Sequence, residues 1–257
     1  MSSVSTHEKA AAFTSRNTDL ADMAAIQEFI DEALVLEVLN VIKSGKEATV
    51  YRCRAHPSLG AKWVAVKVYH SINFQDPAVY DAGRQIANGQ VRRAVNAHTE
   101  FGREAQAAIW TGYEYETLCA LHEAGADVPE PFASTDTAIL MEYVGNGAGA
   151  APQLHFAELE VEEAREAWKR ILWNIELWLK HNLVHADLSD YNILWWGGRP
   201  KVIDLPQAVD PRFNPHARKL LERDVRNVAG YFRRYGAEPD VDGIVRELWE
   251  AWTYGDS

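Results

Sequence analysis

The stretch HADLSDYN, residues 185–192, followed downstream by Ile203-Asp204, decides the fold. An aspartate with an asparagine five residues later supplies, from one loop, a carboxylate that accepts a hydroxyl proton and an oxygen ligand for Mg²⁺. A single loop aspartate is more often a turn former or a helix cap. Three such residues in this order, between an amphipathic helix and a strand pair, indicate phosphoryl transfer. We therefore predict that Asp187 is the catalytic base and that Asn192 and Asp204 bind metal.

A second motif, Val64-Ala65-Val66-Lys67, has the form of the strand that carries the phosphate-binding lysine in protein kinases. An alternative is an edge-strand lysine that discourages aggregation. Beside the loop above, the motif predicts that Lys67 binds the α- and β-phosphates of ATP. A glutamate on the helix after Trp110 would pair with it, and both Glu114 and Glu116 are candidates.

A third motif lies between two expected strands, where a kinase has its glycine-rich loop. It comprises Ser44, Gly45, Lys46, Glu47, Ala48 and Thr49. Only one glycine of the usual three is present, and a lone glycine between strands is usually a simple turn. Backbone N–H groups, the serine hydroxyl and Lys46 could still cover phosphates.

The order of elements predicts an α+β, protein-kinase-like fold with two lobes. Periodicity and turn residues place the expected elements. They are a loose tail over 1–18, a short helix from Asp19, three strands within 36–69, a long insert over 70–106, a helix over 106–122, a strand over 138–144, a linker over 145–152, a helix over 158–180, strands over 193–195 and 201–203, and helix from His216 onward. The expected domains are a tail and short helix over 1–34, an N-lobe over 35–144 and a C-lobe over 145–257.

Composition sets the limits on function. The 257 residues are 47% hydrophobic and 25% charged, as in ordinary globular proteins. A net charge of −11 argues against strong direct nucleic-acid binding, which needs clustered Lys and Arg. No apolar run approaches membrane-spanning length, and no signal peptide is evident. Cys53 and Cys119, in no metal-like spacing, are expected to be reduced thiols in a cytoplasmic protein.

From about Leu36 to Gly236 the chain resembles the RIO family of atypical serine/threonine kinases, most closely its bacterial branch. The segments that carry the resemblance are SGKEATVY (44–51), VAVKVY (64–69), 110–131 with its AG-x-x-VP-x-P ending, LMEYV (140–144), HADLSDYNIL (185–194), IDLPQAV (203–209) and HARKLLERDVRNV (216–228). Family members usually have glycine where this chain has Ala186, and the phosphate-covering loop commonly begins Ser-Thr-Gly rather than Lys43-Ser44-Gly45.

The resemblance implies a role for each candidate residue. Lys67 contacts the ATP phosphates, Glu114 pairs with it, and residues 44–49 cover the phosphates. Met141 gates the adenine back pocket, and the backbone of Glu142 and Val144 contacts adenine. Asp187 is the catalytic aspartate, and Asn192 and Asp204 hold the metal.

The resemblance also implies a reduced C-lobe without an activation segment. Only 53 residues follow Asp204, with no D-F-G glycine and no A-P-E. Asp224 has no firm family role, and we expect a buried aspartate that braces the loop.

Three functions fit these residues. The first is an ATP-dependent serine/threonine protein kinase with autophosphorylation, using Mg²⁺ or Mn²⁺ and acting on itself or on an unknown protein. The second is an ATPase switch on a ribosomal particle, with the 70–106 insert as partner surface and Asp204 as transient phosphate acceptor. The third is a small-molecule kinase. A zinc site at His181 and His185 is disfavoured, because Asn182 stands where the catalytic glutamate would be.

Overall fold

A computed structural model of the chain describes residues 20–70 and 99–255. These residues form two compact units. Of the described residues, 20–70, 99–112 and 132–143 belong to the first, and 113–131 and 144–255 belong to the second. The tail over 1–18 and most of the expected insert, 71–98, lie outside the described residues. The domain boundaries expected from the sequence stay predictions.

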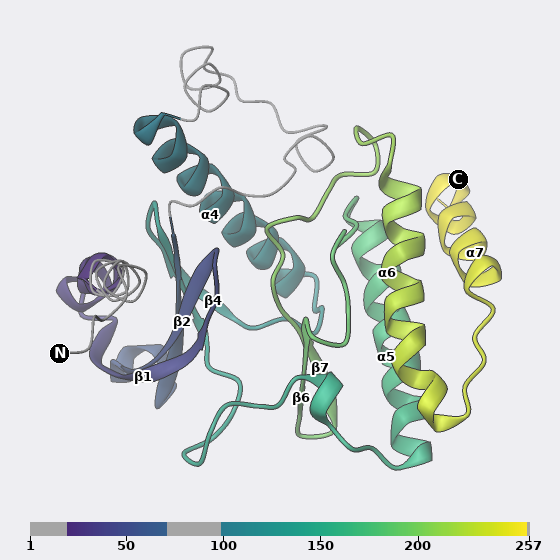
Figure 1. The fold of residues 1–257 in the computed structure, drawn as a ribbon, viewed down its shortest axis with the longest axis horizontal. Coiled ribbons are helices and arrows are strands. Elements are labelled where there is room, and N and C mark those ends of the chain that lie inside the picture. The colour runs from purple at the N-terminus through teal and green to yellow at the C-terminus, as the bar shows by residue number, and fades with distance from the viewer. Residues whose placement is uncertain (1–19, 71–98, 256–257) are drawn as a thin grey trace, which may run out of the picture. The chain divides into compact units, whose positions relative to one another are not determined.

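The first unit is built on a five-stranded sheet with the order β1-β2-β3-β5-β4. Figure 1 labels β1, β2 and β4 of this sheet. Its strands are β1 (Val35–Ser44), β2 (Ala48–Ala55), β3 (Trp63–Tyr69), β4 (Pro131–Ser134) and β5 (Ala138–Glu142). β3 pairs antiparallel with β2 on one side and with β5 on the other, so it is a central strand. The edge-strand interpretation of Lys67 is therefore wrong.

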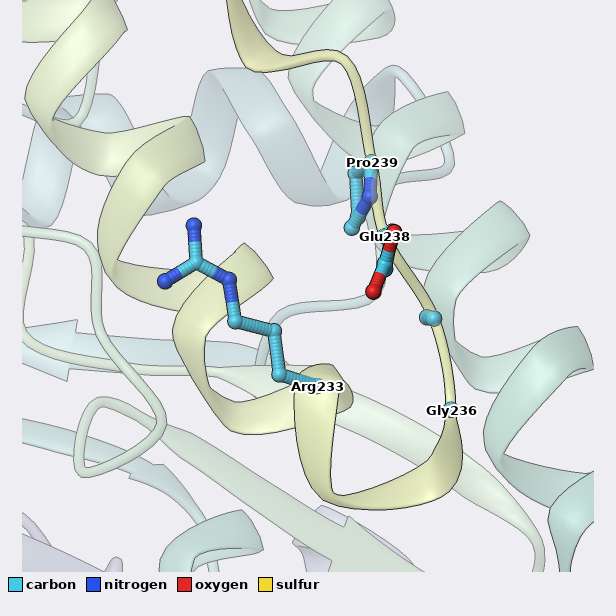
Figure 2. A pocket seen from close by; sticks show the side chains of 5 residues that line it. Arg233, Gly236, Glu238 and Pro239 are labelled. Atoms are coloured by element: carbon cyan, nitrogen blue, oxygen red, sulfur yellow. The ribbon is translucent and has the colours of Figure 1, made fainter.

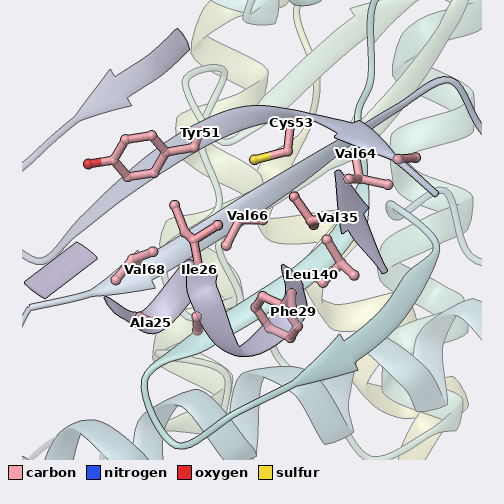
Figure 3. Close-up of a cluster of buried hydrophobic side chains, with 12 residues drawn as sticks. Ala25, Ile26, Phe29, Val35, Tyr51, Cys53, Val64, Val66, Val68 and Leu140 are labelled. Carbon is pink, nitrogen blue, oxygen red and sulfur yellow. The ribbon is translucent and has the colours of Figure 1, made fainter. Parts of the chain in front are cut away.

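A helix over 20–31 covers one face of this sheet. Ala25, Ile26 and Phe29 on the helix point at Val64, Val66 and Val68 on β3 (Figure 3). The helix thus belongs to the core of the first unit, whereas the sequence grouped it with the tail. Leu20, at the start of the helix, is exposed. Because side chains alternate along β3, Lys67 points to the opposite face of the sheet from this core.

Helix α4 (Glu100–Glu123) begins six residues earlier than the sequence predicted. The Thr99 hydroxyl accepts a hydrogen bond of 3.0 Å from the Gly102 N–H, which is the geometry of an N-terminal cap. Its end is as expected, because Gly125 takes a left-handed φ of 83°. Residues 100–106 are therefore helix rather than part of the insert.

The second unit contains α5 (Val161–Lys180), α6 (Ala217–Phe232), α7 (Val241–Tyr254) and the hairpin of β6 (Ile193–Trp196) with β7 (Arg199–Val202). The three helices lie side by side in Figure 1. The single C-terminal helix expected from His216 is two helices. Gly236, at a φ of 77°, breaks the run, and the Asp240 carboxylate caps α7 by accepting from the Gly243 N–H at 3.0 Å.

The segment over 145–152 forms an ordered turn rather than an open linker. Gly145 bridges Ala150, and the Asn146 side chain accepts from the Ala148 N–H at 2.8 Å. A Cβ at Gly145 would lie 2.5 Å from the Gly149 carbonyl oxygen, so a side chain does not fit there. None of the helices in the described ranges is both long and apolar enough to cross a lipid bilayer.

The packing of the helix over 20–31 gives a stability prediction. Phe29 is fully buried, so Phe29→Ala should lower the free energy of unfolding by about 3–5 kcal/mol. Met23→Ala is the matched control, because Met23 lies on the same helix and is 38% exposed. Urea unfolding followed by tryptophan fluorescence measures both. Equal small losses for the two variants would mean that the helix does not pack on the sheet.

Candidate active site

The predicted catalytic loop runs through the second unit between α5 and β6. Isolated β-bridge pairing of Val184 with Val209 fixes its start. Its last residue, Asn192, accepts a bond of 2.9 Å from the Ile203 N–H through its backbone carbonyl, which ties the loop to the segment carrying Asp204. The loop and Asp204 are thus joined by main-chain hydrogen bonds.

Asp224 on α6 holds this loop in place through hydrogen bonds to its backbone. Its carboxylate accepts from the N–H groups of Ala186 at 2.7 Å and Leu188 at 3.0 Å, the two neighbours of Asp187. The side chain is almost fully buried, and burial raises its pKa to about 7 against the opposing effect of the two N–H donors. The loop-bracing role expected for Asp224 fits this geometry.

Two further α6 residues, which the sequence did not single out, hold the same loop. Arg223 donates to the Ala186 carbonyl, and Asn227 donates to the Leu188 carbonyl at 3.1 Å. Ala186 has a left-handed φ of 63°, a conformation that glycine adopts without cost and alanine does not. The bonds from α6 to both of its backbone groups hold Ala186 in that conformation. Polar residues at 223, 224 and 227 on an otherwise amphipathic helix could have predicted from the sequence that this helix binds the loop.

His185 links the loop to Ile203, the residue after β7, through a defined tautomer. A carbonyl only accepts, so the 3.2 Å contact between His185 Nε2 and the Ile203 oxygen requires a proton on Nε2. The Asp187 N–H donates to Nδ1 at 3.3 Å, so that nitrogen is unprotonated. The ring is neutral and positions Asp187 relative to Asp204. His181, at the end of α5, is exposed, and within 20–70 and 99–255 no group of three His, Cys, Asp or Glu side chains is placed to hold a metal ion.

Asp187, Asn192 and Asp204 form one electrostatic group. The Asn192 amide donates to the Asp187 carbonyl at 2.9 Å and to its carboxylate at 3.3 Å. Burial raises the pKa of Asp187, the negative charge of Asp204 raises it further, and Arg223 and Asn192 oppose the rise. Two neighbouring carboxylates with an amide oxygen beside them are the oxygen ligands that Mg²⁺ prefers.

Glu114 on α4 contacts the Asp204 segment. Its Oε1 accepts from the Leu205 N–H at 3.0 Å, and the side chain is 4% exposed. Asp204, with a left-handed φ of 72°, therefore lies between two residues whose backbones are held, Ile203 and Leu205. Of the two glutamates considered from the sequence, the structure gives this anchoring role to Glu114. Its predicted pairing with Lys67 stays a prediction.

The predicted ATP contacts of the first unit lie on and beside the central strands. Lys67 pairs across the sheet with Val50 and Ile139, and its Nζ lies 4.9 Å from the Tyr69 ring centroid. Met141 and Glu142, on β5, pair with Ala65 and Val64.

The predicted phosphate-covering residues form a tight turn between β1 and β2. The Gly45 N–H donates to the Ala48 carbonyl at 2.9 Å, so Gly45, Lys46 and Glu47 form the tip. Val144, in the second unit, accepts at its carbonyl from the Ala151 N–H at 2.9 Å. Its N–H is therefore the better candidate for an adenine contact.

A pocket in the second unit lies at the turn between the 3₁₀ helix over Arg233–Tyr235 and α7 (Figure 2). Its lining residues are Arg233, Gly236, Ala237, Glu238 and Pro239. None of them is a predicted site residue, so this pocket is not the candidate active site.

Comparisons with known proteins show which family this chain resembles. A family model for the RIO domain matches residues 49–244. The serine/threonine-protein kinase RIO1 of Chaetomium thermophilum is 31% identical over 233 residues, covering 86% of this chain and 44% of the relative. The RIO-type serine/threonine-protein kinase Rio1 of Haloferax volcanii is 34% identical over 226 residues, covering 88% of this chain and 73% of the relative.

Among solved structures, the Rio2 kinase of Chaetomium thermophilum, crystallised as an ADP/Mg²⁺-phosphoaspartate complex, gives a TM-score of 0.61. It is 21% identical over 92% of this chain and 71% of that chain, which shows the fold. The class of protein is thus an α+β, protein-kinase-like fold with a sheet lobe and a reduced helical lobe. The chain belongs to the RIO family. Its place in the bacterial branch stays a prediction.

Substitution of Asp224 tests the brace. Asp224→Ala leaves two buried N–H groups without their acceptor, at about 1–3 kcal/mol each, so we expect kcat for ATP turnover to fall roughly 10- to 100-fold. Asp224→Asn keeps one acceptor oxygen and should lose less. Glu222→Gln, on the same helix in an exposed pair with Arg226, is the control. A folded Asp224→Ala protein with the wild-type kcat would contradict the role of Asp224 in holding the loop. If Asp224→Ala does not fold, kcat is measured for Asp224→Asn instead, and a wild-type value there would contradict the same role.

Proposed function

We propose that the chain is an ATP-dependent RIO-type serine/threonine protein kinase. The observation that carries this proposal is the Asp187, Asn192 and Asp204 group, held by α6 and by His185. RIO-family membership and the names of the relatives support it. They also favour a protein kinase over the small-molecule kinase considered from the sequence.

In the proposed reaction Asp187 accepts the proton of the acceptor hydroxyl as that oxygen bonds to the γ-phosphorus and ADP leaves. Burial and the charge of Asp204 raise the pKa of Asp187, which makes it a stronger base than an exposed carboxylate. The bonds from Asn192 and the flanking N–H groups held by Asp224 keep the carboxylate in place.

The residues present fit a divalent cation. The Asn192 Nδ2 donates to Asp187, which leaves Oδ1 of the same amide to face a metal. The negative charge of Asp204 raises the pKa of Asp187, which shows that the two carboxylates repel each other. A cation bound beside them would reduce this repulsion. Asn192 and Asp204 would hold Mg²⁺, which neutralises charge on the transferring phosphoryl group. We propose Mg²⁺, with Mn²⁺ as an alternative that offers the same coordination.

Loss of the base is the direct test of the kinase. Asp187→Asn should lower phosphoryl transfer by about 10²–10⁴-fold while Mg²⁺-dependent ATP binding survives, because the base acts only on the acceptor. Asp190→Asn is a matched control in the same loop, since Asp190 accepts from His155 and has no proposed role in transfer. Radiolabel transfer and ATP calorimetry measure the two properties. Full transfer by a folded Asp187→Asn protein would refute the assignment.

A second candidate function is an ATPase switch in which Asp204 takes up the phosphate. Its left-handed backbone, held on both sides, presents the carboxylate beside the proposed metal. An oxygen of Asp204 would attack the γ-phosphorus, ADP would leave, and water would later cleave the acyl phosphate. The solved Rio2 kinase complex contains a phosphoaspartate. An ordinary metal ligand is the alternative role for Asp204.

Chemical lability separates these two functions. If Asp204 is the acceptor, label from γ-³²P ATP should be released by hydroxylamine and by alkali, and Asp204→Asn should carry no acyl label. Label that survives hydroxylamine and maps to serine or threonine would remove the switch and support autophosphorylation. Adding cell lysate or ribosomal particles tests the proposed partners, a protein substrate or a ribosomal particle.

A cytoplasmic location is proposed on the two free cysteines. Cys53 is buried, which raises the pKa of its thiol to about 12, and Cys119 is also unpaired. Free thiols are ordinary in a reducing compartment.

A further inference from the structure

A run of polar contacts joins the helix over 20–31 to the predicted phosphate-covering loop, residues 44–49. The Tyr51 hydroxyl donates to Asp22 Oδ2 at 2.7 Å, and Asp22 Oδ1 lies 3.5 Å from His70 Nε2. The same nitrogen lies 3.1 Å from the Thr49 hydroxyl, which lies 3.2 Å from the Ser44 hydroxyl. All five residues belong to the first unit, and Thr49 and Ser44 belong to the loop.

The middle of this run is buried. Asp22 is 2% exposed and Thr49 is 3% exposed. A carboxylate in such surroundings is costly unless it is paired and hydrogen-bonded. Tyr51 and His70 provide those partners. The helix over 20–31 thus carries a charged group into the sheet next to the loop, where packing alone would need only apolar residues.

The contact with Asp22 fixes the protonation of one His70 nitrogen. An ionised carboxylate only accepts, so His70 Nε2 must carry a proton toward Asp22. Thr49 accepts from the same Nε2–H group, and either hydroxyl of the Thr49–Ser44 pair can donate to the other. Ser44, at the end of the run, is exposed. The run therefore ties the position of an exposed loop hydroxyl to Asp22 and His70.

His70 also holds the loop backbone. The backbone N–H of His70 donates to the Glu47 carbonyl at 2.8 Å. The imidazole ring of His70 makes a hydrogen bond to the Lys46 backbone. With the contact to Thr49, His70 makes hydrogen bonds to three of the six loop residues: Lys46, Glu47 and Thr49. A protonated imidazole has two N–H donors and a neutral one has one, so loss of the proton removes part of this grip.

We propose that Asp22 and protonated His70 form a buried ionic latch that positions residues 44–49, so that ATP affinity depends on the protonation of His70. The proposal rests on the proposed ATP-binding function of the loop. Asp22 and His70 act here as positioning residues, since they act through Ser44 and Thr49.

The groups that face His70 raise its pKa, and only burial lowers it. The hydrogen bond from Asp22 raises the pKa of His70, burial opposes this, and the Asp22 charge and the Lys46 backbone raise it further. From β2, the Tyr51 hydroxyl binds Asp22, and Thr49 carries no charge. The pKa therefore lies above its ordinary 6.5. The latch is complete below pH 6.5 and is lost as pH rises through the raised pKa.

Calorimetric titration of the full chain with ATP and Mg²⁺ from pH 5.5 to 8.5 tests the latch. In the wild type the Kd should rise roughly 3- to 10-fold across the His70 titration, as expected for losing a charge-assisted hydrogen bond. Asp22→Asn should weaken binding at pH 6 and move the break to lower pH or abolish it. Asp31→Asn should follow the wild type, because Asp31 lies on the same helix and accepts from the Gln27 side chain at the surface.

ATP itself gains and loses protons over this pH range, and this changes the Kd of both variants equally. The difference between the Kd profiles of the two variants therefore reports on the protein alone. Identical pH profiles for Asp22→Asn and Asp31→Asn would overturn the latch. Should Asp22→Asn not fold, His70→Gln replaces it, since glutamine keeps a donor but does not titrate, and an unchanged profile there would overturn the latch equally. A wild-type protein that binds no ATP at any pH would instead refute the proposed function.

Discussion

The second unit depends on one buried interaction, the carboxylate of Asp224 with the N–H groups of Ala186 and Leu188. These bonds hold the backbone on both sides of Asp187 against α6, and Asn192 holds the Asp187 carboxylate. They also stabilise a left-handed conformation at Ala186, which an alanine in an unsupported loop would avoid. Together with the bonds from Arg223 and Asn227, they hold the catalytic loop against α6.

The same logic extends to Asp204. Ile203 is held by His185 and by the Asn192 carbonyl, and Leu205 is held by Glu114. The backbone of a residue with positive φ between two such anchors is held in place from both sides. The Asp204 carboxylate is the group proposed to bind the metal. In this unit, buried polar groups from α4, α6 and the loop itself position the backbone around the three side chains proposed for the chemistry.

Much of this could be predicted from the sequence, because the informative residues are local. The spacing of Asp187, Asn192 and Asp204, the apolar strand around Lys67 and the amphipathic helix over 161–180 all lie in short windows, and the structure forms these elements. Long-range contacts were harder. The bond from Glu114 to Leu205 spans 91 residues, and the pairing of Asp22 with His70 joins a helix to the end of β3. The sequence also placed the start of α4 too late, because the cap at Thr99 lies in a polar stretch without apolar period. The helix over 20–31 was grouped with a tail because one short helix gives no sign of what it packs against.

The central claim is that Asn192 and Asp204, beside the base Asp187 in its braced loop, bind Mg²⁺ together with ATP. The most direct measurement is calorimetric titration of ATP into the wild type and into Asn192→Leu, each with Mg²⁺ and with EDTA. The account predicts ATP binding by the wild type that strengthens markedly with Mg²⁺, and loss of that metal dependence in Asn192→Leu, which has similar volume but no oxygen ligand. ATP binding by the wild type that is the same with Mg²⁺ and with EDTA would contradict it.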